Sequence, residues 1–168
     1  MKRGFVCLFA KPCFCIKNLF CLRVKQEEAK TLVEMTLLAK TEYLDQVIAF
    51  VNEHLEANGC SMMAQFQLDI AVEELFVNIA SYAYRPADGP VTIQLHFEGD
   101  CASVVFIDGG RPYNPWEKED PDTTLSAEER EIGGLGIYMV KQSMNHVDYS
   151  YEEGKNILTI QKNIQEEL

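Results

Sequence analysis

Glu74 and Asn78, in the stretch VEELFVNIA, are the first residues whose types and spacing suggest chemistry. Their separation of four residues places a carboxylate and a carboxamide one above the other on a single helix face. Asparagine is a poor helix former, and the neighbours of Asn78 are apolar. A polar pair in an apolar stretch needs a partner, and a magnesium ion with its waters is one candidate. The alternative is that Glu73 and Glu74 line a solvated face while Asn78 binds a backbone carbonyl.

The stretch FIDGGRPYNP suggests a site that reads a base. An apolar strand ends at Asp108 and runs into Gly109 and Gly110, where a planar group can lie close to the bare backbone. A carboxylate at this place accepts a hydrogen bond from an exocyclic amine. Adenine offers such an amine, whereas guanine presents a carbonyl that the carboxylate repels. The alternative is an ordinary Asp-Gly turn.

The stretch EIGGLGIYMV contains three glycines, Gly133, Gly134 and Gly136, just before an apolar helical pattern. Backbone N–H groups of such a segment can wrap phosphate oxygens, helped by the positive end of the helix. The stretch is not a P-loop, because no G-x-x-x-x-G-K-[ST] occurs. A Rossmann fingerprint would need a glycine where Met139 stands. A flexible hinge is the alternative.

The elements that must position these residues follow from hydrophobic periodicity. The first half of the domain reads as a short strand over 35–40, a helix over 41–57 and a longer helix over 61–84. Thr41 and Ser61 are the expected N-caps of the two helices. We expect the aromatic residues of the second helix and its end to pack in the core or against helices: Phe76, Tyr82 and Tyr84.

The second half alternates between hairpins and one helix. Residues 91–108 read as a hairpin around a Gly-Asp turn, and residues 146–163 as another around Gly154. Between them, 109–132 shows neither period, as expected for a functional lid or a disordered loop, and the glycines open a helix that ends near 144. This order predicts a two-layer α/β sandwich with an antiparallel or mixed sheet and the helices on one face.

Composition excludes some classes of protein and separates the N-terminal segment from the rest. The net charge of −11 argues against nucleic-acid binding, and no apolar run approaches the ~20 residues of a membrane-spanning helix. Residues 1–25 hold basic residues, no acidic ones and four of the six cysteines. A targeting segment and a metal site are alternatives for this stretch, but we expect 1–34 to be a poorly ordered extension. The domain is then 35–168, in the cytoplasm.

The three motifs together resemble the boxes of the Bergerat-fold ATPases. This superfamily includes gyrase, heat-shock chaperones, mismatch-repair proteins and the ATP domain of histidine kinases. Within it, the forms DGGRPYNP and GGLGIYMVKQSMNHVDYSYEEGKN are most similar to the anti-sigma factor serine kinases and their stand-alone bacterial relatives. The resemblance spans about 35–163. It departs at Arg111 and Pro112, where many members of the superfamily have x-G.

The resemblance implies a role for each matching residue. Glu74 corresponds to the general base and Asn78 to the magnesium ligand, while Asp108 corresponds to the residue that reads adenine. The backbone positions implied in nucleotide binding are Gly110, which gives room for the base, and the phosphate-binding segment Gly133, Gly134, Leu135 and Gly136. Arg130 is a candidate for the γ-phosphate, although pairing with the acidic residues around it is the simpler interpretation.

The implied function is ATP-dependent and has two forms. The first is a serine/threonine kinase that moves the γ-phosphoryl group of Mg-ATP to a small STAS-domain antagonist protein. The second is a non-catalytic module that holds ATP to sequester a sigma factor or another regulator. A second copy of the chain is a further candidate partner, whereas nucleic acid and membranes are not expected. Histidine phosphorylation is disfavoured, because the three histidines are isolated and the chain has no room for dimerisation helices.

Overall fold

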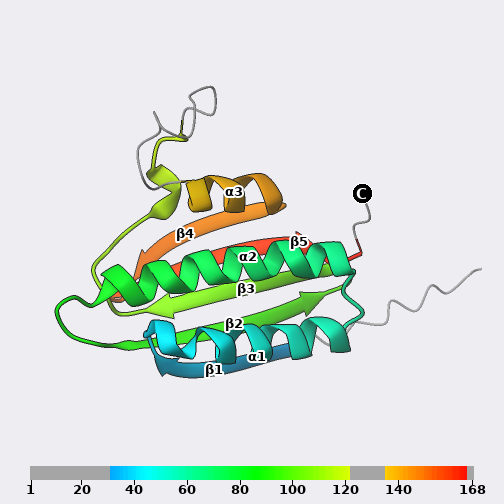
Figure 1. The fold of residues 1–168 in the computed structure, drawn as a ribbon, viewed down its shortest axis with the longest axis horizontal. Coiled ribbons are helices and arrows are strands. Elements are labelled where there is room, and N and C mark those ends of the chain that lie inside the picture. Colours follow the sequence, from blue (N-terminus) through cyan, green and yellow to red (C-terminus); the bar gives the residue numbers. More distant parts are fainter. Residues whose placement is uncertain (1–30, 122–134, 166–168) are drawn as a thin grey trace, which may run out of the picture.

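One five-stranded sheet forms the base of the molecule in the computed structural model, which describes residues 31–121 and 135–165 (Figure 1). The strands, in sheet order, are β1 (Thr31–Leu38), β2 (Pro90–Glu98), β3 (Cys101–Asp108), β5 (Lys155–Asn163) and β4 (His146–Glu152). Every pairing between them is antiparallel, which decides between the two sheet types that the sequence left open. The basic segment up to residue 30, Arg130, Gly133 and Gly134 lie outside the described residues.

The alternation of residues along β2 shows why the sheet has one buried face. Val91, Ile93 and Leu95 are fully buried, while the residues between them lie on the opposite, partly exposed face. The register pairs Val91 with Asp108 and Glu98 with Cys101, so the two-residue turn falls at Gly99 and Asp100. Gly99 has φ of +56°, a left-handed conformation that suits glycine. Both predicted hairpins are confirmed.

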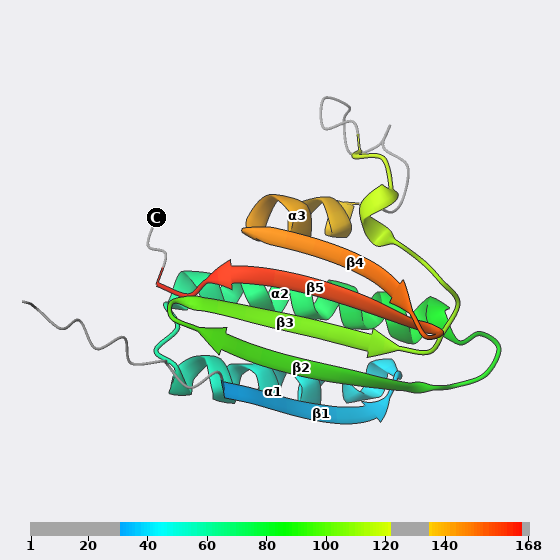
Figure 2. The same ribbon diagram turned by 180° about the vertical axis from the view of Figure 1, so that it is seen from behind.

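Three helices cover that buried face: α1 (Leu44–Ala57), α2 (Met62–Asn78) and α3 (Leu135–Ser143). Figure 1 views the molecule from the helix side, and Figure 2, from behind, shows the sheet in front of them. This arrangement confirms the predicted two-layer fold. Among the described residues, no helix is long and apolar enough to cross a membrane.

The two predicted N-caps have different outcomes. The Ser61 side chain accepts a hydrogen bond from the Ala64 backbone N–H at 3.3 Å and so begins α2, as predicted. Thr41 caps nothing: it is the first residue of a 3₁₀ turn (Thr41–Tyr43) that precedes α1, and no side chain caps either segment. The helical period of this region is thus correct, but its first turn is tighter than predicted.

The core lies between the helices and the sheet and fixes α2 along its length. Its fully buried side chains include Val47, Val51 and Leu55 of α1, Leu68, Leu75 and Phe76 of α2, and Ile93, Leu95, Val104 and Phe106 of the sheet. Each such side chain stabilises the fold by about 1.5–3 kcal/mol through burial. The packing therefore holds the C-terminal end of α2, with Glu74 and Asn78, at a defined place above the sheet.

The strand β1 begins four residues earlier than predicted. Residues 31–34, which we assigned to the extension, pair with β2 from Thr31 opposite Phe97 to Glu34 opposite Gln94. The Gln94 amide also donates a hydrogen bond to the Glu34 carboxylate at 3.0 Å. Met35 suggested a natural start for the domain, but the apolar-polar alternation continues upstream of it, and the strand follows the alternation.

Candidate functional site

Glu74 and Asn78 occupy one face of the last turns of α2, as their spacing predicts. The Asn78 Nδ2 donates a hydrogen bond to Glu74 Oε1 at 2.8 Å. On its other side the Glu74 carboxylate lies against Gly136 in the first turn of α3, where a Cβ would overlap the carboxylate atoms. A side chain at 136 would have to displace this carboxylate, so the glycine allows both groups to occupy their places. The glutamate is thus held between the carboxamide and the start of α3.

Asp108 ends β3 and is almost completely buried, with 4% of its surface exposed. Its Oδ1 accepts two hydrogen bonds, from the Gly110 backbone N–H at 2.8 Å and from Asn156 Nδ2 at 3.0 Å. The described residues offer no hydrogen bond to its Oδ2. A carboxylate oxygen without a protein donor is well placed to accept a hydrogen bond from a ligand.

The glycines after Asp108 bring the chain against the end of the long helix. α2 continues as a π-helical turn, Ile79–Ala83, and a Cβ at Gly110 would lie 2.6 Å from the Cβ and carbonyl oxygen of Ala83. The Arg111 backbone N–H donates to that same carbonyl at 2.9 Å. In the described residues the space beside Gly110 is therefore filled by Ala83. Its predicted role in making room for a base stays a prediction.

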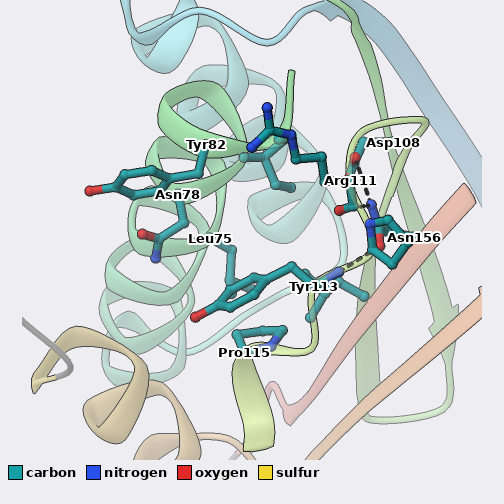
Figure 3. A pocket seen from close by; sticks show the side chains of 12 residues that line it. Leu75, Asn78, Tyr82, Asp108, Arg111, Tyr113, Pro115 and Asn156 are labelled. Atoms are coloured by element: carbon teal, nitrogen blue, oxygen red, sulfur yellow. Dashed lines mark hydrogen bonds between the residues drawn. The ribbon is translucent and has the colours of Figure 1, made fainter. Parts of the chain in front are cut away.

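A cavity of about 220 Å³ lies between these elements. Leu75, Asn78 and Tyr82 line it on the side of the helix, and Asp108 and Asn156 line it on the side of the sheet (Figure 3). The cavity is smaller than the roughly 300–1,000 Å³ of a pocket that encloses a drug-sized ligand, so it suits one part of a nucleotide, such as the base. Its walls are largely apolar, with Asp108 Oδ2 as an acceptor at one side.

The first part of the predicted lid forms another wall of this cavity. Arg111, Pro112, Tyr113 and Pro115 all line it. The segment contains a short 3₁₀ turn, Pro115–Glu117, and the indole N–H of its tryptophan donates to the Asp148 carbonyl of β4 at 3.0 Å. The described part of this segment therefore lines the pocket, as the prediction of a lid requires.

A sequence model of the histidine kinase-like ATPase domain matches residues 37–162, three quarters of the chain. The chain belongs to this family. Two relatives are serine-protein kinases named RsbW. The one from Listeria innocua is 27% identical over 131 residues, which cover 75% of this chain and 83% of the relative. The one from Bacillus mycoides is 27% identical over 130 residues, covering 75% and 81%.

A solved structure shows the same fold as this ATPase domain. The crystal structure of the RsbU and RsbW domains of Rv1364c from Mycobacterium tuberculosis matches with a TM-score of 0.58 and 16% identity. The match covers 80% of this chain, which spans only 32% of the other chain. Together with the family match, it confirms the fold class and the family resemblance that the motifs indicated.

The end of α2 in this ATPase domain fits a magnesium ion bound mainly through a nucleotide. Because the Asn78 Nδ2 is committed to Glu74, the carbonyl Oδ1 of the same amide remains as an oxygen ligand. The described residues contain no group of three or more His, Cys, Asp or Glu side chains that could hold a metal. Magnesium usually takes only one or two protein ligands and completes its shell with phosphates and waters. A single carboxamide oxygen is compatible with this mode.

Two tyrosines at the end of the long helix have roles that the sequence did not indicate. Tyr82, which we expected to pack, is 65% exposed and lines the cavity, whereas Phe76 is fully buried as expected. The Tyr84 hydroxyl accepts from the Gly109 N–H at 2.7 Å and donates to the Pro90 carbonyl, so it ties the turn after Asp108 to β2. Burial raises the pKa of Tyr84, which keeps this donor protonated.

Asn156 is a further residue of this site that sequence reasoning missed. It lies at the start of β5 and is 3% exposed, and its side chain reaches Asp108 across the sheet. One signal could have found it, because it occupies the inward position of an alternating strand whose next inward residues are Leu158 and Ile160. A buried amide in an apolar row needs specific partners.

Proposed function

We propose that this chain binds ATP, with the adenine in the cavity and its exocyclic amine donating to Asp108. The observation that carries the proposal is that Asp108 lines an apolar cavity while both of its protein donors meet one oxygen, Oδ1. Membership of the ATPase family supports it. The amine of adenine fits this acceptor, whereas the carbonyl of guanine is repelled by it.

The phosphates then extend along α2 toward the start of α3. Gly136 lies there beside Glu74, and Leu135 precedes it, continuing the predicted phosphate-binding segment from Gly133 and Gly134. We place the Asn78 Oδ1 on the magnesium ion that accompanies the phosphates. A bound magnesium ion would neutralise phosphate charge during transfer.

The chemistry that we propose is phosphoryl transfer to a serine of a partner protein. The serine hydroxyl attacks the γ-phosphorus of ATP, the bond from that phosphorus to the ADP oxygen breaks, and Glu74 accepts the hydroxyl proton. The support is the carboxylate at the end of α2, together with the serine-protein kinase names of the relatives. We infer a small STAS-domain protein as the acceptor and a sigma factor as a further partner.

A non-catalytic role is the second candidate, and one observation favours it. The Glu74 carboxylate does not line the cavity but lies between Asn78 and Gly136, where it bridges two helices. A glutamate whose role is to join α2 to α3 would serve a module that holds ATP only to shape a surface for a regulator.

A pair of neighbouring substitutions tests the proposed base. Glu74→Gln keeps the size and the hydrogen bond to Asn78 but cannot accept the proton, so transfer of label from radiolabelled ATP should fall by ~10²–10⁴-fold while ATP still binds. Glu73→Gln, at the exposed neighbouring position of α2, is the matched control and should transfer normally. The acceptors to assay are candidate STAS proteins.

Three results would contradict this proposal. Label on a histidine of this chain excludes serine transfer as the main reaction. Equal transfer by the Glu74→Gln and Glu73→Gln proteins removes Glu74 as the base. Binding of ATP by the unmodified chain without transfer to any candidate favours the non-catalytic module.

A further inference from the structure

Asn156 is fully hydrogen-bonded in the wall of the cavity, although the proposed chemistry does not use it. Its Nδ2 donates to Asp108 Oδ1 at 3.0 Å and to the Arg111 carbonyl at 3.1 Å (Figure 3). Its Oδ1 accepts from the Tyr113 backbone N–H at 3.2 Å and from the Tyr149 hydroxyl at 2.8 Å. Since both ends of the amide are committed to protein groups, Asn156 acts on these groups and not directly on a ligand.

These partners fix the direction in which the amide points. One side offers two donors, the Tyr113 N–H and the Tyr149 O–H, and the other offers two acceptors, the Asp108 carboxylate and the Arg111 carbonyl. Turning the amide over would set its oxygen against the carboxylate and its NH₂ against the Tyr113 N–H. Burial raises the pKa of the Tyr149 hydroxyl, which therefore keeps the proton that it donates.

The fixed amide in turn sets what Asp108 can accept. The donors from Gly110 and Asn156 both meet Oδ1, so only Oδ2 is left for a ligand. We propose that Asn156 and Tyr149 are positioning residues that make this site prefer a purine with an amine at position 6 over one with a carbonyl there, by holding Asp108 as an acceptor on one side only. This inference rests on the proposed ATP site.

Inosine triphosphate is the probe, because its base carries a carbonyl in place of that amine, with a proton on the adjacent ring nitrogen N1, and is otherwise the same as the base of ATP. We expect the unmodified chain to bind ATP more tightly than inosine triphosphate in titration calorimetry. Tyr149→Phe removes one of the two donors to the Asn156 oxygen, so the preference for ATP should fall about 3–10-fold. Tyr151→Phe is the matched control on the same strand, where the side chain is 47% exposed, and its preference should not change.

A second pair of variants replaces a side-chain amide with a carboxylate. Asn156→Asp sets a carboxylate against Asp108, so the affinity for ATP should fall by about 10-fold or more and the preference should disappear. Asn163→Asp, at the exposed end of the same strand, keeps its acceptor oxygen and should bind like the unmodified chain. Thermal unfolding of each variant reports whether it folds, and if Asn156→Asp does not, Tyr149→Phe decides.

The outcomes separate this inference from the proposed function. If the unmodified chain prefers ATP and Tyr149→Phe keeps the full preference, or weakens both nucleotides equally, the positioning role is overturned while the ATP site stands. If the unmodified chain binds ATP and inosine triphosphate equally, the inferred preference is also overturned. If it binds no ATP, the proposed function is overturned and this inference with it.

Discussion

The sequence offered two alternatives for Asp108, a residue that reads a base and an ordinary Asp-Gly turn, and the structure is compatible with both. The Asp108 Oδ1 bonds the Gly110 N–H two residues on, as in an ordinary Asp-Gly turn, and also the amide of Asn156. Its Oδ2 has no donor among the described residues, and the residue lines the cavity. One oxygen thus builds the turn, and the other is available to a ligand.

Asp108→Asn tests whether the two carboxylate oxygens have these separate roles. An asparagine keeps its oxygen toward Gly110 and Asn156 and presents an NH₂ group where the adenine amine should donate. Because two donors then face each other, ATP binding should weaken by about 1–3 kcal/mol, with little change in folding stability. Calorimetric titration of ATP and GTP is the measurement, with Asp100→Asn in the distant β2–β3 turn as the control. Unchanged binding of ATP, or equal affinity of the unmodified chain for ATP and GTP, would contradict the site.

A second carboxylate, Asp69, lies between α1 and α2 in an unfavourable environment. Asn52 Nδ2 donates to its Oδ2 at 3.3 Å, but Asn52 Oδ1 and Asp69 Oδ1 are buried and have no partner among the described residues. Burial raises the pKa of Asp69 above its ordinary value of 3.8, although the Asn52 hydrogen bond lowers it. The folded protein therefore binds this proton more readily than the unfolded chain. Its stabilising effect is complete below pH 3.8 and is lost as pH rises through the folded pKa.

Asp69→Asn should consequently stabilise the protein at neutral pH. The new NH₂ group can donate to Asn52 Oδ1, and a neutral side chain replaces a buried charge, so we expect a gain of about 1 kcal/mol at pH 7. The gain should shrink as pH falls through the raised pKa of Asp69, because the carboxylate then takes up its proton. Chemical unfolding at several pH values measures it, with the exposed Asp148→Asn as the control. A constant difference across this pH range would show that Asp69 titrates normally.

Among the helices, the start of α3 sets how closely α3 approaches the Glu74 side chain of α2. Gly136 lies against Glu74, and further along α3 the Lys141 ammonium binds the Asp120 carboxylate at 2.8 Å and the Lys118 carbonyl at 3.0 Å. The Trp116 indole N–H, in the 3₁₀ turn just before Lys118, donates a hydrogen bond to the Asp148 carbonyl of β4. The segment up to residue 120 is thus fastened to α3 and β4, which keeps the cavity wall in place.

Gly136→Ala tests the contact between α3 and Glu74. The added methyl group would displace the glutamate carboxylate, which is the flexible end of a side chain, so the fold should survive. Alanine also favours a helix by about 1 kcal/mol over glycine, which offsets part of the cost. We therefore expect an unfolding temperature close to that of the unmodified chain but phosphoryl transfer reduced at least about 10-fold, the low end of a misplaced catalytic group. Gln142→Ala, exposed on α3, is the control, and normal transfer by Gly136→Ala would exclude a role for this contact.

For the whole molecule, local patterns predicted the described helices and strands in their correct order. Alternation and helical spacing depend on neighbours in sequence, so they are visible without the fold. The pairing of Glu74 with Asn78 was visible for the same reason. The inward position of Asn156 on its strand was visible too, but its role was not, because its partners Asp108, Arg111 and Tyr113 are more than 40 residues away and meet it only through the order of the sheet. The start of β1 was missed because Met35 suggested the start of the domain, although the apolar-polar alternation continues upstream of it.

That edge strand gives a prediction about the whole chain. Residues 31–34 supply half of β1, and Val33 packs against the core, so a chain that starts at residue 35 loses this burial and its backbone pairs with β2. We expect it to unfold about 5 °C below a chain that starts at residue 31, as a loss of 1–2 kcal/mol implies. The chain that starts at 31 should unfold within about 2 °C of the full-length protein, which would support 1–30 as an extension outside the domain.

Thermal unfolding of the three chains, followed by circular dichroism, measures this difference. Both shortened chains should bind ATP with the same affinity, because the cavity lies at the opposite edge of β3 from β1, between α2 and β5. Equal unfolding temperatures for the two shortened chains would show that residues 31–34 add nothing to the sheet. A lower temperature already in the chain that starts at 31 would instead place part of the stability in residues 1–30.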